Sequence, residues 1–178
     1  MDSQFEKFLE DYETGVVERV IDGDTAIING NSTRFLGINT PEKGEKYYQE
    51  AKDFLSGLVL NKTVKMEYGK ERTDLYGRRL PYIILDGKNI NIEQVRNGFA
   101  NLYIYNPDKY TGQLKQAWNE CISNGKNLCE KSKDKCACVE LKEFYDQSVV
   151  LYNNCGFDCN LTGWTIKDEG RKKFIFED

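Results

Sequence analysis

Three short stretches of this sequence hold residue types suited to the hydrolysis of a phosphodiester. They are residues 22–25 (DGDT), residues 34–42 (RFLGINTPE) and residues 72–78 (RTDLYGR). Two arginines, Arg34 and Arg78, each offer a planar fork of donors that matches a pair of phosphate oxygens. The three stretches therefore indicate a site that binds a phosphate group.

Oxygen-bearing side chains in the first two stretches suit a hard metal ion. The oxygens of Asp24, Asn39 and Thr40 are of the kind that calcium prefers, and Glu42 can accept a proton from a water molecule. Taken alone, the DGDT tetrapeptide is more often an ordinary Asx turn. The sequence has no histidine, which excludes serine–histidine catalysis, cysteine–histidine catalysis and every histidine-ligated metal site.

The net charge of the chain is −4, whereas phosphate contacts favour a basic face. Residues 1–13 carry five acids and one lysine, so this segment accounts for the whole net charge. The remaining 165 residues are neutral and can still carry a basic cleft. We expect weaker long-range steering of a nucleic acid than a basic enzyme would show.

Short β-rich segments alternate with helical patterns along the chain. Segments rich in β-branched residues predict strands, and the spacing of apolar residues predicts helices. The expected strands are 16–21, 25–28, 33–38, 64–68 and 80–85, and the expected helices are 45–60, 93–97 and 113–123. The DGDT stretch then falls at a strand junction and the RTDLYGR stretch in a polar loop between strands. About five short strands with helices between them favour a small closed barrel with helices packed beside it.

The first fifteen residues are predicted to form a helical extension. Ser3 and Glu6 read as a capping box, and Gly15 can end the helix. Apolar residues at helical spacing support it: Phe5, Phe8, Leu9 and Tyr12. This segment lacks the apolar region of a signal peptide.

Residues 16–128 resemble the staphylococcal nuclease family. The resemblance rests on four motifs in order: DGDT, RxxGxxTPE over residues 34–42, RTDxYGR over residues 72–78, and VRNGFA over residues 95–100. It implies an α+β fold: an OB-fold five-stranded β-barrel with about three helices. It also implies a calcium-dependent endonuclease that acts on DNA and RNA, preferably single-stranded or frayed, and leaves 3′-phosphate ends.

The same resemblance assigns roles to single residues. Calcium would be held by the Asp24 carboxylate and the Thr40 carbonyl, with Asn39 in the same shell and Asp22 as outer support. Glu42 would position or deprotonate the attacking water, while Arg34 and Arg78 would hold the scissile phosphate. Four further residues would lie near the nucleotide: Asp74, Tyr76, Tyr103 and Tyr105. For the last two tyrosines, packing at the rim of the core is the alternative.

Three departures from the family pattern point to weaker binding. Asn39 stands where the family's best-known member has an aspartate, and an amide oxygen carries no negative charge. Leu75 replaces a lysine that the family uses at a terminal phosphate. The loop between Glu42 and the next helix is also short.

The six cysteines all follow the active-site motifs. An even number predicts disulfides in a secreted protein, although six cysteines allow 15 connectivities. We expect Cys136 and Cys138 to pair with Cys155 and Cys159 in some order. Zinc binding is the alternative, with these four cysteines and Cys129 as the possible ligands, although their spacings are not those of CxxC knuckles. Cys121 can instead be a buried small hydrophobe on a helix face.

The sequence changes character after residue 128. Residues 129–148 are charged and bear cysteines, as a tether would. Within residues 149–178 the sequence predicts two strands, around residues 149–154 and 160–168. This segment resembles the start of a lamin-tail domain, an immunoglobulin-like sandwich. About 30 residues cannot close a sandwich that needs about 100. This segment is therefore a partial lamin-tail-like piece or a cysteine-tethered hairpin without independent function.

Two functions remain open from the sequence. The favoured one is the calcium-dependent nuclease, because both arginines and the glutamate are present together. The alternative is an OB-fold module that binds single-stranded nucleic acid and cuts it weakly or not at all. We expect a monomer that acts outside the cell or at its surface. We expect no membrane insertion, because no segment is long and apolar enough to cross a membrane.

Overall fold

A computed structural model of the 178-residue chain describes residues 12–145, 148–167 and 172–177. The chain divides into two compact units, residues 1–130 and residues 131–178. Within the described ranges, no helix has the length and apolar character needed to cross a membrane. The first unit carries the three motif stretches of the predicted site.

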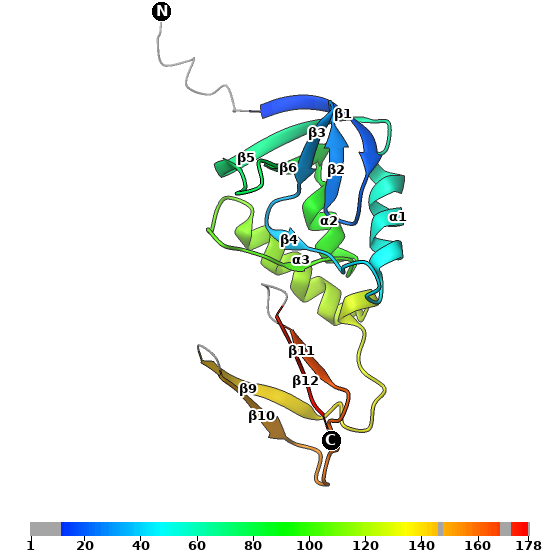
Figure 1. The fold of residues 1–178 in the computed structure, drawn as a ribbon, viewed down its shortest axis with the longest axis vertical. Helices are drawn as coiled ribbons and strands as arrows, with labels where there is room; N and C mark the ends of the chain where they lie inside the picture. Colours follow the sequence, from blue (N-terminus) through cyan, green and yellow to red (C-terminus); the bar gives the residue numbers. More distant parts are fainter. Residues whose placement is uncertain (1–11, 146–147, 168–171, 178) are drawn as a thin grey trace, which may run out of the picture. The chain divides into compact units, whose positions relative to one another are not determined.

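A closed barrel of five strands forms the first unit (Figure 1). Its strands are β1 (Tyr12–Val20), β2 (Thr25–Ile28), β3 (Asn31–Arg34), β5 (Thr63–Thr73) and β6 (Arg79–Leu85). They are hydrogen-bonded in the order β3-β2-β1-β5-β6, and β3 also pairs with β6 in parallel, with Thr33 opposite Arg79. This last pairing closes the sheet on itself and confirms the predicted OB-type barrel.

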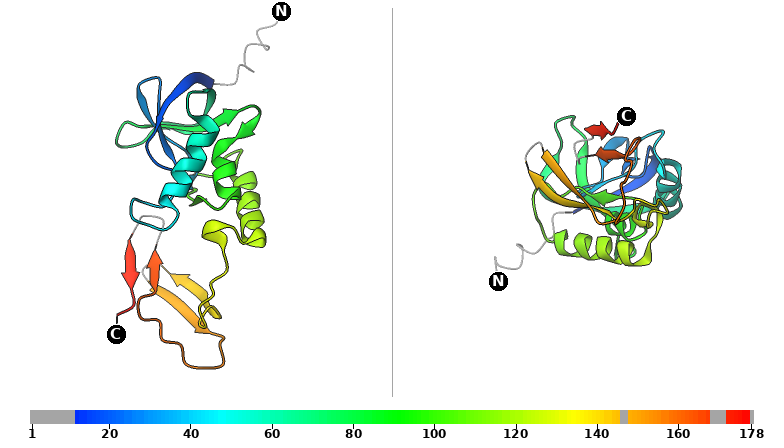
Figure 2. Two further views of the ribbon diagram at one scale, coloured as in Figure 1. Left: turned by 90° about the vertical axis from the view of Figure 1, so that its right-hand side faces the viewer. Right: turned by 90° about the horizontal axis from the view of Figure 1, so that it is seen from below.

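Three α-helices accompany the barrel: α1 (Tyr48–Val59), α2 (Ile90–Arg96) and α3 (Thr111–Asn124). Figure 2 shows α1, in cyan, running along the outside of the strands. Helix α2 begins three residues earlier than the sequence predicts, because the Asn89 side chain accepts a hydrogen bond from the Ile92 amide and caps it. Short strands β4 (Ile38–Asn39), β7 (Lys88–Asn89) and β8 (Asn101–Leu102) and a 3₁₀ turn (Asn127–Cys129) complete the unit.

The core of this unit lies between the barrel and its helices. Apolar side chains alternate into the interior from the strands, and α1 and α3 add apolar residues at helical spacing. The largest fully buried apolar side chains are Phe35, Ile28, Ile38, Leu55, Met66, Ile83 and Leu114. Both strands that flank the DGDT stretch thus have inward faces fixed in the core.

The predicted N-terminal helix is wrong where the structure can test it. Tyr12–Val16 belong to β1 and pair antiparallel with residues 63–67 of β5, while residues 1–11 lie outside the described residues. Long-range partners explain the strand: the Glu13 carboxylate accepts from Arg72 at 2.8 Å and from Arg79 at 3.2 Å. A local helical pattern carries no information about such partners.

The second unit consists of two small antiparallel pairs. Strand β9 (Val139–Tyr145) pairs with β10 (Ser148–Asn153), and β11 (Thr165–Lys167) pairs with β12 (Lys173–Ile175). Part of the expected tether therefore forms a strand. Both segments in which the sequence predicts a strand, around residues 149–154 and 160–168, contain one.

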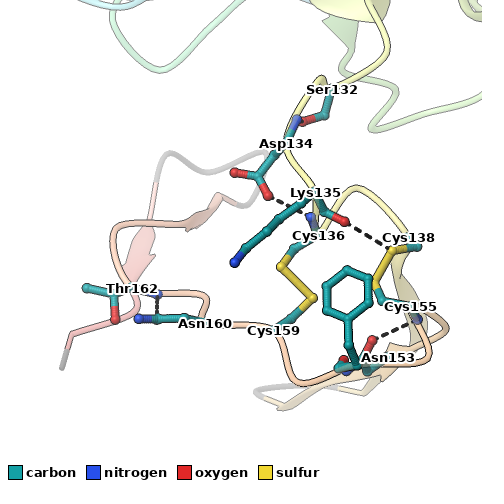
Figure 3. The surroundings of a disulfide bond; sticks show 11 residues. Ser132, Asp134, Lys135, Cys136, Cys138, Asn153, Cys155, Cys159, Asn160 and Thr162 are labelled. Carbon is teal, nitrogen blue, oxygen red and sulfur yellow. Dashed lines mark hydrogen bonds between the residues drawn. A yellow bond between two sulfur atoms is a disulfide. The ribbon is translucent and has the colours of Figure 1, made fainter.

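All six cysteines form disulfides. Cys136 bonds to Cys159 and Cys138 to Cys155, within the set of pairings that the sequence predicts (Figure 3). Cys121, which the sequence analysis treats as a buried hydrophobe, is buried but bonds to Cys129. Disulfide sulfurs are not thiolates, so these bonds leave no cysteine ligands for zinc.

Candidate active site

The DGDT stretch forms a tight turn between β1 and β2. The Asp22 carboxylate accepts from the Asp24 amide at 3.1 Å, and the Ile21 amide donates to the Thr25 carbonyl at 2.9 Å. The Asp24 carbonyl accepts from the Phe35 amide at 2.7 Å, which ties this turn to the end of β3. The turn is thus held by backbone bonds on both sides and presents the Asp24 side chain inward.

The Asp24 carboxylate is 3% exposed and has four protein partners. Its Oδ2 accepts from the Thr40 amide at 2.7 Å and from the Thr40 hydroxyl at 2.9 Å. Its Oδ1 accepts from the Thr25 hydroxyl at 3.0 Å and lies 3.1 Å from Nε of Arg34. The carboxylate therefore joins the ends of β2, β3 and β4 at one buried point.

Arg34 is 7% exposed and spreads its guanidinium over three acceptors. Besides Asp24, it donates to the Asn39 Oδ1 at 3.0 Å and to the Phe35 carbonyl at 2.6 Å. The structure thus brings together four of the predicted residues: Asp24, Arg34, Asn39 and Thr40.

Glu42 follows Thr40 by two residues and is half-buried. Its amide donates to the Glu45 carboxylate at 2.9 Å, and the Glu45 amide donates back to the Glu42 carbonyl at 2.8 Å. The short loop continues to Lys46, whose ammonium pairs with the Glu130 carboxylate. The loop that carries Glu42 is therefore connected to the end of the first unit, directly after Cys129.

Arg78 is placed by a turn whose centre is the Asp74 carboxylate. Asp74 Oδ1 accepts from the amides of Tyr76 and Arg78, and its Oδ2 accepts from the Arg78 guanidinium at 2.7 Å. Burial alone would raise the pKa of Asp74, but these bonds outweigh it and lower the pKa below its ordinary value. The predicted nucleotide contact Asp74 thus also orients Arg78.

Both arginines line one open cavity of about 760 Å³. Asp74, Tyr76, Tyr103 and Tyr105 line it as well, so it contains all four predicted nucleotide-binding residues. Tyr76 and Tyr105 are more than four-fifths exposed, and the Arg78 guanidinium lies 5.5 Å from the centre of the Tyr76 ring. Asp24 and Glu42 do not line this cavity; Asp24 is linked to it through Arg34.

The residues around Asp24 can be compared with the needs of a hard cation. The atoms that Asp24, Asn39 and Thr40 would offer to a metal ion are oxygens, which fits calcium. Asp22 adds a second carboxyl beside Asp24. Burial, and then the charge of Asp24, raise the pKa of Asp22. Within the described ranges, no three Asp, Glu, Cys or His side chains converge. A calcium ion at Asp24 would therefore be held by few charged ligands.

Two polar clusters, one of which lines the cavity, are not predicted from the sequence. The Tyr82 hydroxyl donates to the Asp108 carboxylate at 2.8 Å, and both residues line the cavity beside the tyrosine-bearing segment 103–105. Nearby, the buried Glu67 carboxylate accepts from Lys65, Lys109 and Tyr110. These pairs, apart from Lys65 with Glu67, are separated by more than 25 residues, so no local pattern could reveal them.

Comparisons with known proteins agree with this arrangement. Residues 32–131 match the family described as staphylococcal nuclease homologue. The chain is 34% identical over 143 residues to a thermonuclease of Staphylococcus intermedius, covering 73% of this chain and 85% of that protein. It is 34% identical over 127 residues to a thermonuclease of Staphylococcus hyicus (65% and 75%), and 33% identical over 129 residues to endonuclease YncB of Bacillus subtilis (65% and 61%).

Proposed function

Since this chain belongs to the staphylococcal nuclease family, we propose that it is a calcium-dependent endonuclease of DNA and RNA that leaves 3′-phosphate ends. One observation carries the proposal: Arg34 and Arg78 line the same cavity, while Arg34 is bonded to Asp24. A phosphodiester in that cavity would meet two guanidinium groups beside a carboxylate suited to a metal ion.

The two arginines would stabilise the charge that grows on phosphate in the transition state. Their donors are held in place before substrate arrives, Arg78 by Asp74 and Arg34 by Asp24 and Asn39. Preorganised donors of this kind do not have to reorient during the reaction, which makes them effective catalysts.

Asp24, Asn39 and the Thr40 carbonyl would hold the calcium ion. When bound, the ion would supply positive charge next to the phosphate and polarise it. Since Arg34 and the ion would share Asp24, its binding would weaken the Arg34–Asp24 pair and leave Arg34 more available to phosphate. Glu42, two residues beyond Thr40, would hold the attacking water and take its proton.

The four residues Asp74, Tyr76, Tyr103 and Tyr105 would contact the nucleotide next to the scissile bond. The exposed rings of Tyr76 and Tyr105 favour unpaired bases, whose faces are open for stacking. We therefore propose that single-stranded or frayed nucleic acid is the preferred substrate.

The setting of the proposed enzyme follows from its disulfides. Three such bonds indicate an oxidising compartment, so we propose action outside the cell or at its surface, as a monomer. We also propose that residues 149–178 form a lamin-tail-like segment.

The second candidate is a module that binds single strands and cuts weakly. It is favoured by one observation: four protein donors already occupy the Asp24 carboxylate, which has about four acceptor positions. Digestion of plasmid DNA with calcium and with a chelator separates the two. Calcium-dependent digestion supports the enzyme, whereas tight binding of single strands without digestion supports the module.

A further inference from the structure

A fully buried glutamine connects the acidic turn to two helices. Gln94 lies on α2 and is 0% exposed. Its Nε2 donates to the carbonyl of Gly23, the middle residue of the Asp22–Asp24 turn, and to the carbonyl of Ala51 on α1 at 3.3 Å. One amide group therefore holds this turn against α1 and α2.

The turn itself is packed without spare room. A Cβ atom added to Gly23 would lie 2.8 Å from the Ala51 Cβ and 2.8 Å from the Thr40 Cγ2. Thr40 is the residue that donates twice to Asp24. A shift of the Gly23 backbone would therefore move the Asp24 carboxylate relative to the Thr40 donors.

The Oε1 atom of Gln94 differs from its Nε2 atom in hydrogen bonding. Its Oε1 is buried and finds no hydrogen-bond donor in the part of the chain that the structure describes. A buried acceptor without a partner costs stability. A methionine or leucine at this core position would remove that acceptor, but it would leave the Gly23 carbonyl without its Nε2 donor. Packing therefore does not explain the amide, whereas its bond to Gly23 does.

We propose that Gln94 is a positioning residue for Asp24. It acts through the Gly23 carbonyl and keeps the Asp22–Asp24 turn seated, so that the Asp24 carboxylate stays where Arg34, Asn39 and Thr40 meet. This inference rests on the proposed function, because it gives Gln94 a role in calcium binding and phosphodiester cleavage. Calcium binding would depend strongly on Asp24, because the amide of Asn39 is neutral and leaves the Asp24 carboxylate as the principal charge of the site.

Gln94→Met tests the proposal because methionine has similar length and no amide. The change exchanges one orphaned acceptor, the Gln94 Oε1, for another, the Gly23 carbonyl, so the melting temperature should stay within about 5 °C of wild type. Calcium affinity, measured by calorimetry in the absence of substrate, should fall by about tenfold or more. The kcat should also fall at saturating calcium, while the KM for DNA should not change.

Ile92→Met is the matched control, since Ile92 is a buried residue of the same helix. It should leave calcium affinity and kcat unchanged. If Gln94→Met does not fold, Gln94→Leu provides the same measurement, together with hydrogen exchange of the Thr40 amide, which should become faster as its bond to Asp24 loosens.

Two results would overturn the role of Gln94 alone. One is a folded Gln94→Met protein with wild-type calcium affinity and kcat. The other is a Gln94→Met protein whose melting temperature falls while its calcium affinity is retained. Gln94 would then have a structural role only. A wild type that neither binds calcium nor cuts DNA would instead overturn the proposed function, and this role of Gln94 with it.

Discussion

The Nε atom of Arg34 lies 3.1 Å from Oδ1 of Asp24, and both side chains are less than a tenth exposed. The guanidinium group of Arg34 is thus paired with the Asp24 carboxylate, which would be the main ligand of the candidate metal site. The pair keeps a buried carboxylate compensated without a metal. It also means that a calcium ion at Asp24 would compete with Arg34, so metal binding and arginine position should be coupled.

Arg34→Lys and Arg78→Lys should each lower kcat by about 100-fold or more while the protein stays folded. Lysine keeps the charge but lacks the planar fork that donates to two oxygens at once. Steady-state cleavage of DNA, with circular dichroism to verify folding, measures the effect. Arg79→Lys is the control, because Arg79 pairs with Glu13 and does not line the cavity. Near wild-type turnover in either variant would remove that arginine from the catalytic set.

Asn39→Asp should lower the calcium concentration needed for half-maximal nuclease rate. The added carboxylate would give the site a second strong ligand beside Asp24. Titration of the rate with calcium makes the comparison. Asn101→Asp, on the strand residue paired with Asn39, adds the same charge at an exposed position and controls for long-range attraction. Equal half-saturation in wild type and Asn39→Asp would place Asn39 outside the metal shell.

The sequence predicts most of the fold because its signals are local. The β-rich residues 25–28 and 80–85 form β2 and most of β6, and the helical spacing of residues 113–123 is kept in α3, because their apolar side chains meet the core. The helix predicted around Tyr12 fails because strand pairing with β5 overrides the local pattern. Helix α2 begins at Ile90 and not at the predicted residue 93, because the Asn89 side chain caps it.

The site is only partly readable from sequence. Motif spacing places Asp24, Arg34, Asn39 and Thr40 together, because strand ends bring them to one edge of the barrel. Gln94 is hidden, since its bond to Gly23 spans 71 residues. The Cys121 disulfide is also not predicted: its position on a helix face indicates a core residue, and Cys121 is buried, but it bonds to the half-buried Cys129.

Glu67→Gln should make the free energy of unfolding less dependent on pH in the acid range. Burial raises the pKa of Glu67, but hydrogen bonds from Tyr110, Lys109 and Lys65 outweigh it and lower the pKa from 4.5 to about 2. The folded protein thus binds fewer protons, so this stabilisation is complete above pH 4.5 and is lost as the pH falls towards 2. At pH 7 the variant should lose about 2–3 kcal/mol of unfolding free energy.

Urea unfolding from pH 7 to pH 2 measures the Glu67 effect. Glu50→Gln, at an exposed position of α1, should match the wild-type profile. A Glu67→Gln protein whose stability falls as steeply as that of wild type would show that this carboxylate is not a source of the acid sensitivity.

The disulfides of the two units should have separate effects. Replacing both members of Cys136–Cys159 and of Cys138–Cys155 with alanine should make residues 131–178 protease-sensitive and leave the nuclease rate unchanged. Replacing Cys121 and Cys129 should destabilise the first unit by about 2–3 kcal/mol, as expected for a short closed loop. Limited proteolysis and unfolding curves read these out. A nuclease rate that falls with the four-alanine variant would contradict the assignment of activity to the first unit.

Cleavage of a DNA substrate over a range of free calcium, followed by identification of the new ends, tests the proposed nuclease activity most directly. We predict that cleavage rises with calcium, stops with a chelator, and leaves 3′-phosphate and 5′-hydroxyl ends. Cleavage that persists in chelator would contradict calcium dependence. Binding without cleavage at any calcium concentration would contradict the enzyme itself.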